Sequence, residues 1–186
     1  TIGKVDKQEL EKLAVQGADK VIHIENEKLN TLDDQAYTSL VADVARKYNA
    51  TVLVLSNNNS GKALAPRLSV QLKAGLVSGV SKLPVSVSPF VVYKKVYSGK
   101  AYANVRIKTD IKILTLAQNS FEIIHNPKPF VVEHLNIAPN DNLLNTKVKD
   151  VQKLTGKVLL TDADIVVSGG RGMKSPDNWG PLVELA

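Results

Sequence analysis

The chain of 186 residues contains no cysteine and a single methionine. The absence of cysteine excludes disulfides, thiolate catalysis and zinc or iron–sulfur sites with cysteine ligands. No apolar run approaches the roughly 18 residues that a membrane-spanning helix requires, and the first ten residues lack the apolar segment of a signal peptide. We therefore expect no membrane insertion, and the lack of cysteine is compatible with a reducing cytosol.

Aromatic residues are also scarce, at 5% of the chain, whereas basic residues exceed acidic ones by 24 to 18. A net charge of +6 could attract nucleic acid or an acidic partner. The lysines are spread along the chain, so the sequence shows no stacking platform interleaved with cations. We expect no nucleic-acid binding, and a basic surface that faces a nucleotide or an acidic subunit explains the charge equally well.

Helical and extended patterns alternate in the first third of the chain. Residues 6–16 have helical spacing, with Asp6 as a candidate cap and Gly17 closing the helix. Asp33 or Asp34 caps a longer helix that ends near Tyr48. The stretches 21–24 and 51–55 are apolar, and the second resembles a strand buried on both faces. This alternation predicts an α/β fold with a parallel sheet.

A polar loop follows Leu55 and leads into a helix with Leu64, Leu68 and Leu72 on one side. Pro66 is awkward there, because proline is tolerated best in the first turn of a helix. Either the helix begins near Ala65, or residues 61–65 form a looser turn.

The second half of the chain is richer in extended runs. Residues 91–108 predict a hairpin around Ser98-Gly99, and further strands are predicted at 111–116, 130–132 and 164–168, with a polar connector at 140–160. We expect the two halves to share one sheet. The predicted fold class is α/β, a mostly parallel sheet flanked by helices in three layers, Rossmann-like, with an added β-hairpin region.

A glycine-rich loop, Ser168–Ser175, follows the last predicted strand. Glycines allow backbone N–H groups to approach an anion closely, and Arg171 can bind a phosphate through two hydrogen bonds. The standard motifs do not match, because Ser175 stands where the dinucleotide fingerprint has glycine and Met173 where the P-loop has glycine. A structural turn with a solvated Arg171 remains an alternative.

The loop Ser56–Lys62 lies at the carboxyl end of a predicted parallel strand, where α/β proteins tend to bind ligands. It is no P-loop, since Ala63 follows Gly61-Lys62, and a polar surface loop is the favoured interpretation. The remaining polar residues also have structural interpretations: core or surface histidines (His23, His125, His134), a helix cap (Asp33-Asp34), a turn (Asp162, Asp164) and an exposed edge (Lys94-Lys95). No nucleophile stands with a base.

Three stretches together resemble the α subunit of electron transfer flavoproteins: "GKALAPRLSVQLKAGLVSGVSKL", "KKVYSGKAYANVRIKTDIKILTL" and "DADIVVSGGRGMKSPDNW". They occur in the family's order and with its separations, and the similarity extends from about Lys20 onward. The chain departs from the family at four positions: Lys94-Lys95 replaces Arg-Pro, Lys100 replaces Asn, and Gly79 replaces Asp.

The resemblance implies an adenine-nucleotide-hydrolase-like fold cut at both ends. Residues 1–160 would be the N-terminal domain without its first strand, helix and strand, and residues 161–186 the start of the FAD-binding domain. Gly170, Arg171 and Gly172 would contribute to the FAD site, and a cation there would favour anionic flavin. The remaining FAD contacts would lie in the part of that domain that is missing here.

The resemblance also implies partners and a role. The α subunit pairs with a β subunit that holds AMP, and the heterodimer carries electrons from flavin dehydrogenases, such as the acyl-CoA dehydrogenases of fatty acid β-oxidation, to a quinone oxidoreductase. It is an electron carrier rather than an enzyme, expected here in the bacterial cytoplasm. The alternative is a stand-alone nucleotide-binding α/β module, with ATP or AMP at Ser56–Ala65.

Overall fold

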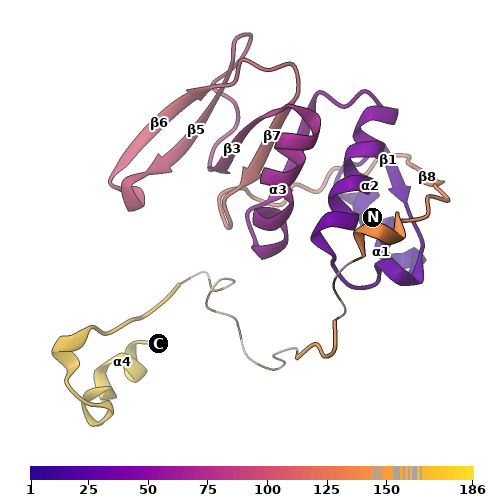
Figure 1. Ribbon diagram of the computed structural model, residues 1–186. Helices are drawn as coiled ribbons and strands as arrows, with labels where there is room; N and C mark the ends of the chain where they lie inside the picture. Colours follow the sequence, from indigo (N-terminus) through magenta and orange to yellow (C-terminus); the bar gives the residue numbers. More distant parts are fainter. Residues whose placement is uncertain are drawn as a thin grey trace. The chain divides into compact units, whose positions relative to one another are not determined.

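The computed structural model describes residues 1–144, 146, 148–152, 156, 158, 160, 163 and 165–186. The chain divides into two compact units, residues 1–150 and residues 151–186 (Figure 1). Each unit is described by itself. Within the described residues, no helix is both long enough and apolar enough to cross a bilayer.

The first unit begins with the predicted alternation of helices and strands: α1 (Lys7–Val15), β1 (Lys20–His23), α2 (Asp34–Lys47), β2 (Val52–Ser56) and α3 (Asn59–Leu72). Asp33 is the cap of α2, and its carboxylate accepts hydrogen bonds from the backbone N–H groups of Gln35 and Ala36. Asp6 occupies the N-cap position of α1 without a side-chain cap hydrogen bond. Gly17, at φ +93°, turns the chain out of that helix.

The larger sheet contains six strands in the order β2-β7-β3-β5-β4, with β6 paired to β5. The strands not yet introduced are β3 (Gly75–Val80), β4 (Ser86–Val87), β5 (Phe90–Val96), β6 (Ala101–Arg106) and β7 (Lys112–Leu116). β7 is parallel to both β2 and β3, whereas β5 is antiparallel to β3, β4 and β6. The fold is therefore α/β, an open mixed sheet flanked by helices with an added hairpin, as predicted.

A second, two-stranded sheet joins β1 to β8 (Val131–His134) in parallel. Its register runs from Lys20 opposite Val131 to His23 opposite His134. The expectation that the two halves of the chain share one sheet holds for β2, β3 and the strands β5 to β7, but β1 and β8 pair outside that sheet. The pairing joins segments more than 100 residues apart, and no local sequence pattern encodes such a partner.

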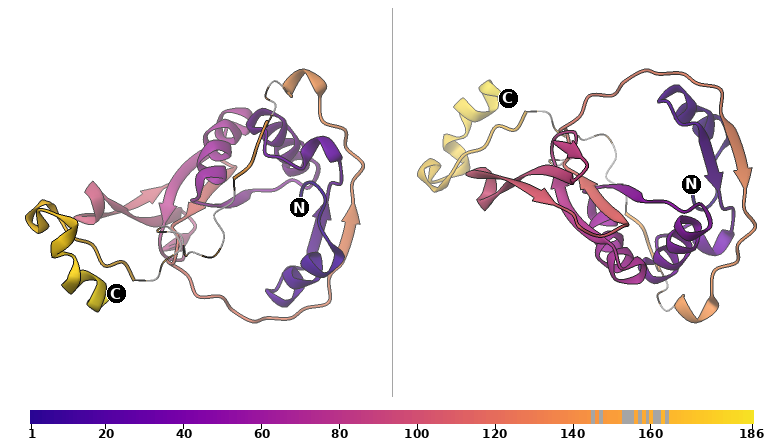
Figure 2. Two further views of the ribbon diagram at one scale, coloured as in Figure 1. Left: turned by 90° about the horizontal axis from the view of Figure 1, so that it is seen from below. Right: turned by 90° about the horizontal axis from the view of Figure 1, so that it is seen from above.

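Helices α2 and α3 carry most of the core between the two sheets (Figure 2). One face of α2 contributes Ala42 and Ala45 to a cluster with the leucines of α3 and Ile113 of β7. Another face contributes Ala36 and Leu40 to a cluster with residues beside β1, Ile24 and Leu29. Small residues on α2 allow α3 to approach closely, so the two helices connect the sheets.

Strand β2 differs from its prediction. Its apolar sequence predicted burial on both faces, but it lies at the edge of the sheet, and among the described strands it pairs with β7 alone. Val52 and Val54 are 40% and 56% exposed. Apolar composition alone does not distinguish a central strand from an edge strand whose outer side is uncovered.

Helix α3 also differs from its prediction, because it begins at Asn59 and continues through Pro66. Neither a start near Ala65 nor a loose turn at 61–65 is formed. Pro66 removes one N–H group, which would have bonded to the carbonyl of Lys62. Lys62 lies on the exposed side of the helix, where water can satisfy that carbonyl.

The second unit contains two 3-10 turns, η4 (Arg171–Met173) and η5 (Pro176–Asn178), followed by the short helix α4 (Gly180–Leu185). The strand predicted at 164–168 is not formed in its described part, residues 165–168. A strand requires a neighbour for its backbone hydrogen bonds, and the described residues of this unit offer none. The expected boundary after residue 160 stays a prediction.

Candidate functional site

The glycine-rich loop of the second unit leaves a run of backbone donors open. The carbonyls of Gly170 and Arg171 accept hydrogen bonds from the N–H groups of Met173 and Lys174, at 3.0 and 3.2 Å. Within the described residues, the N–H groups of Gly170, Arg171 and Gly172 donate to no acceptor. Backbone N–H groups without an acceptor are available to donate hydrogen bonds to an anion.

The glycines of this loop have different roles. A Cβ at Gly169 would lie 2.6 Å from Leu182 Cδ1 and 2.8 Å from Met173 Cγ, so this glycine is required for packing against α4. A Cβ at Gly170 or Gly172 would meet nothing within 4 Å. The backbone at these two positions is therefore accessible to a ligand.

Side chains outside the glycines hold the loop in shape. Asn178 Nδ2 donates to the carbonyl of Met173 at 2.9 Å, and Ser175 Oγ donates to Asp177 Oδ2 at 3.0 Å. The side chain of Arg171 is exposed and makes no hydrogen bond or ion pair with other described residues. Its guanidinium is free to bind an anion beside the open N–H groups.

An apolar hollow adjoins the loop, lined by Val167, Gly169, Trp179, Leu182, Val183 and Ala186. The indole of Trp179, the only tryptophan of the chain, is half exposed in it. Open amide donors, an arginine and an apolar wall within one unit fit a cofactor that combines a diphosphate with aromatic rings. FAD has this chemistry.

The loop Ser56–Lys62 is closed by its own side chains. Asn58 caps α3, because its Oδ1 accepts a hydrogen bond from the N–H of Gly61 at 2.9 Å. A Cβ at Gly61 would lie only 1.7 Å from the carbonyl oxygen of Ser56. Only glycine therefore fits at position 61, where the first turn of α3 passes the end of β2. One N–H group of that turn, that of Gly61, is already bonded to Asn58 and is not available to a ligand.

Asn57 is also engaged within the fold. Thr115 Oγ1 donates to Asn57 Oδ1 at 2.9 Å and accepts from the N–H of Gly79 at 3.0 Å. Gly79 lies at φ +70°, a conformation that an L side chain rarely adopts. These bonds tie the carboxyl ends of β2, β7 and β3 together, and they agree with the interpretation of Ser56–Lys62 as a structural loop.

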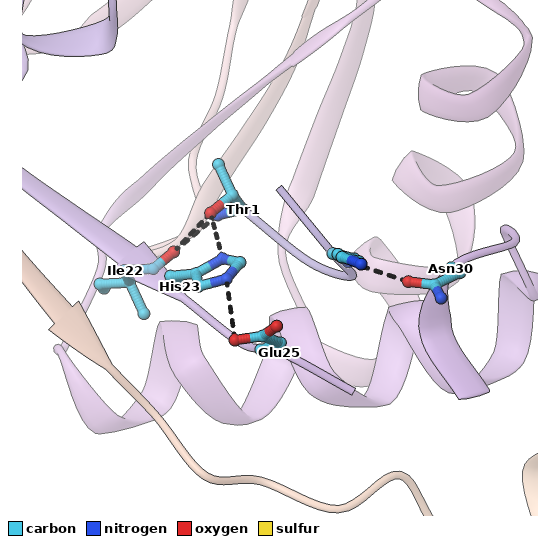
Figure 3. Close-up of polar contacts among 6 residues, drawn as sticks. Thr1, Ile22, His23, Glu25 and Asn30 are labelled. Carbon is cyan, nitrogen blue, oxygen red and sulfur yellow. Dashed lines mark hydrogen bonds and ion pairs between the residues drawn. The ribbon is translucent and has the colours of Figure 1, made fainter. Parts of the chain in front are cut away.

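The structure brings two of the three histidines together. The rings of His23 and His134 lie 5.4 Å apart in an edge-on arrangement across the β1–β8 pair. His23 is buried, with Nδ1 2.9 Å from Thr1 Oγ1 and Nε2 4.0 Å from Glu25 (Figure 3). Burial, and then the neighbouring His134, lower the pKa of His23.

No metal site accompanies this pair. Across the described parts of the chain, no three His, Cys, Asp or Glu side chains converge as ligands. His23 is a core histidine and His134 a surface one, in agreement with the interpretation from the sequence. Asp162 and Asp164 lie outside the described residues.

The lysine pair predicted on an exposed edge is placed differently. Strand β5 is internal, because β6 pairs along one side of it and β3 and β4 along the other. Lys95 is exposed, but Lys94 is only partly so, opposite Ala103 and Val80. The edge of the hairpin is β6.

An aromatic–cationic surface was not predicted from the sequence, yet the hairpin forms one. The rings of Tyr93 and Tyr102 stack at 5.1 Å, and Lys82 Nζ lies 4.7 Å from the centre of the Tyr93 ring. The signal that could have revealed it is charge segregation. The 66 residues from Val44 to Thr109 contain 11 lysines and arginines and no aspartate or glutamate.

Fold and loop together define an α/β protein with an added hairpin and a glycine-rich loop whose backbone donors stay open. The family model for the electron transfer flavoprotein domain matches residues 1–155. The chain belongs to the electron transfer flavoprotein family.

Curated relatives give the same assignment along the whole chain. It is 32% identical to the electron transfer flavoprotein subunit alpha of Bacillus subtilis, over 100% of this chain and 57% of the relative. The corresponding protein of Syntrophomonas wolfei is 28% identical over 93% of this chain and 55% of its own length. A probable mitochondrial electron transfer flavoprotein subunit alpha of Caenorhabditis elegans is 29% identical over 92% of this chain and 51% of its own length. The chain thus spans about half the length of the curated relatives it matches.

Proposed function

We propose that this chain is the N-terminal part of the α subunit of an electron transfer flavoprotein. Together with a β subunit that holds AMP, the full protein would bind FAD and carry electrons from flavin dehydrogenases, such as acyl-CoA dehydrogenases, to a quinone oxidoreductase. In this role it is a carrier in the bacterial cytoplasm and transforms no substrate itself. FAD supplies the redox chemistry when bound.

The observation that carries the proposal is the open loop at Gly170–Gly172 in a chain of this family. Three N–H groups without an acceptor in the described part of the chain, one arginine and an adjoining apolar hollow offer complementary contacts for a diphosphate and a ring system. Arg171 would neutralise negative charge on the cofactor, and the two glycines would let the backbone approach it. Gly170, Arg171 and Gly172 are the residues we propose to contact FAD.

The test is Arg171→Ala in the full-length protein co-expressed with its β subunit. Loss of one charge-assisted contact predicts FAD that is released about tenfold more readily, or a lowered flavin potential, since the removed cation favoured the reduced anionic form. Flavin content is read from the visible absorbance per subunit, and the potential by redox titration.

Arg67→Ala is the matched control, because Arg67 is an exposed arginine on α3 in the first unit. It should leave flavin content and potential unchanged. Unchanged values in the Arg171 variant as well would refute the assignment of this loop.

We further propose the domain organisation that the resemblance implies. Residues 1–160 would be the N-terminal domain, and residues 161–186 would open the FAD-binding domain, whose remainder supplies most cofactor contacts. Two observations support a longer protein: the relatives are nearly twice as long, and β2 lies at an edge of the sheet with one apolar face uncovered, where Val54 is 56% exposed. An additional strand from a preceding segment would pair with the open backbone of β2, and an additional helix would cover that face.

The stand-alone nucleotide-binding module is less well supported. Its proposed loop, Ser56–Ala65, is closed by Asn58 and by the contact of Gly61 with Ser56. Calorimetry of the 186-residue chain with AMP and ATP distinguishes the two proposals. The carrier proposal predicts no binding at this loop, and binding that Asn58→Ala or Lys62→Ala alters would favour the module.

A further inference from the structure

The hairpin β5–β6 has two chemically different faces. Directly opposed residues of an antiparallel pair share a face, so the register places Phe90, Val92 and Val105 on one side. These three pack into an apolar cluster with Val77 and Leu114. The other face carries Tyr93, Lys95, Tyr102, Asn104 and Arg106. We call this second set, together with Lys82, the hairpin face.

The hairpin face is cationic and has no compensating carboxylate. Lys82, Lys95 and Arg106 are exposed, and no described residue forms an ion pair with any of them. The 28 residues from Lys82 to Thr109 contain six lysines and arginines and no acidic residue. That excess equals the net charge of the whole chain, +6. The segment thus holds more than half of the 11 basic residues in the acid-free stretch from Val44 to Thr109.

Apolar and aromatic side chains accompany the charge. Tyr102 is 58% exposed, and Leu83, Val85 and Val87, which follow Lys82, are 60–77% exposed. Tyrosine and arginine are enriched in protein–protein interfaces, and the exposed aliphatic side chains add apolar area beside them. We propose that the hairpin face is a docking surface for an acidic patch on a partner protein.

The arrangement of the rings favours a protein over a nucleic acid. Bases bind single-strand platforms by stacking on open aromatic faces. Here the two rings cover each other's inner faces at 5.1 Å between centres, and the ammonium of Lys82 lies 4.7 Å from the centre of Tyr93, so the stack offers one open ring face, that of Tyr102, and not a series for successive bases. Carboxylates need no open ring, since they bind the ammonium and guanidinium groups around it.

The experiment uses two acidic polypeptides as probes, poly-L-glutamate and the random copolymer of glutamate and tyrosine. Binding to the 186-residue chain is measured by fluorescence anisotropy at low and physiological salt. The proposal predicts that both bind, that the copolymer binds more tightly because its rings contact Tyr102, and that affinity falls with salt. Duplex DNA of equal charge and phosphatidylglycerol vesicles are the competing probes.

The double variant Lys95→Glu/Arg106→Glu should weaken binding of the copolymer at least about tenfold. Its matched control, Lys62→Glu/Arg67→Glu, reverses one lysine and one arginine on the exposed side of α3, within the same carboxylate-free stretch. The control should change affinity by less than about twofold. Tyr102→Ala should abolish the preference for the copolymer over poly-L-glutamate, and circular dichroism confirms that each variant is folded.

Equal weakening by both double variants would overturn the proposal, because binding would then follow net charge alone. The proposal would also be overturned if DNA or the vesicles bound more tightly than the copolymer and Lys95→Glu/Arg106→Glu abolished that binding. These outcomes do not depend on flavin, so failure here leaves the assignment of the Gly170–Gly172 loop untouched.

Discussion

The two glycine-containing loops, Ser56–Lys62 and Ser168–Ser175, both combine serine, glycine and lysine, but their backbones are used in opposite ways. In the first unit, Asn58 and Ser56 enclose Gly61, and the N–H group of Gly61 already donates a hydrogen bond to the side chain of Asn58. In the second unit, Gly170 and Gly172 face open space, and three amides have no acceptor among the residues that the structure describes. A glycine beside a lysine therefore does not define a ligand site; what matters is whether the surrounding side chains have already satisfied the backbone.

The largest expected effect is on Gly61. Gly61→Ala places a methyl group within 1.7 Å of the carbonyl oxygen of Ser56, so strand or helix must shift. We expect a loss of about 3 kcal/mol in the free energy of unfolding of the first unit. Urea unfolding followed by circular dichroism measures it. Wild-type stability in this variant would contradict the close contact between α3 and β2.

The cap of α2 should come next. Burial raises the pKa of Asp33, but hydrogen bonds from Ala36, Thr146 and Gln35 outweigh it and hold the pKa below its usual value. A depressed pKa contributes stability above the ordinary value of about 4, and that contribution is lost as the pH falls through the folded-state value. Asp33→Asn should lower the free energy of unfolding by about 2 kcal/mol at pH 7, and by less in acid once the pH has fallen through the folded-state pKa of Asp33.

Asp34→Asn serves as the control for that measurement. Asp34 lies in the first turn, and its side chain makes no cap hydrogen bond. Its effect should stay below about 0.5 kcal/mol at both pH values. If the free energies of unfolding of the wild type and Asp33→Asn differed as much in acid as at pH 7, the charge of the carboxylate would not be the cause.

A smaller effect is expected at the cap of α3. Asn58→Ala removes the acceptor for the N–H of Gly61, which should cost about 1 kcal/mol. Asn58→Asp restores the acceptor and should recover most of that loss, with urea unfolding as the readout. Equal losses in both variants would mean that the cap hydrogen bond does not stabilise the helix.

The smallest effect on stability should be in the open loop. Gly170→Ala and Gly172→Ala add methyl groups that touch nothing, so folding should change by less than about 0.5 kcal/mol. Fluorescence of Trp179, the only tryptophan, reports on this unit directly. In the full-length protein the same variants should reduce FAD content, and a shifted tryptophan spectrum without flavin would reveal a packing role instead.

Elements defined by local signals were predictable from the sequence. The spacing of apolar residues in α2, the cap at Asp33 and the turn at Ser98-Gly99 are encoded by neighbouring residues, and the structure confirms them. Elements defined by distant partners were not predictable. The position of β2 at an edge, the pairing of β1 with β8 and the absence of a strand at 165–168 each depend on which other strand is available.

The candidate site was predictable only in part. The glycines and Arg171 could be selected from the sequence, but the difference between the two loops depends on Asn58, Ser56 and Leu182, which no motif includes. The hairpin face was missed because Lys82, Tyr93 and Tyr102 are separated in the chain and meet only through strand register. Charge counted by segment would have indicated it.

The central claim, that the open amides of Gly170, Arg171 and Gly172 hold the cofactor, is tested most directly by amide hydrogen exchange in the full-length protein with its β subunit. Exchange at these three amides is measured with FAD bound and after its removal. The account predicts at least about tenfold slower exchange in the FAD-bound protein. Equal exchange rates in the two states, with flavin occupancy verified, would contradict it.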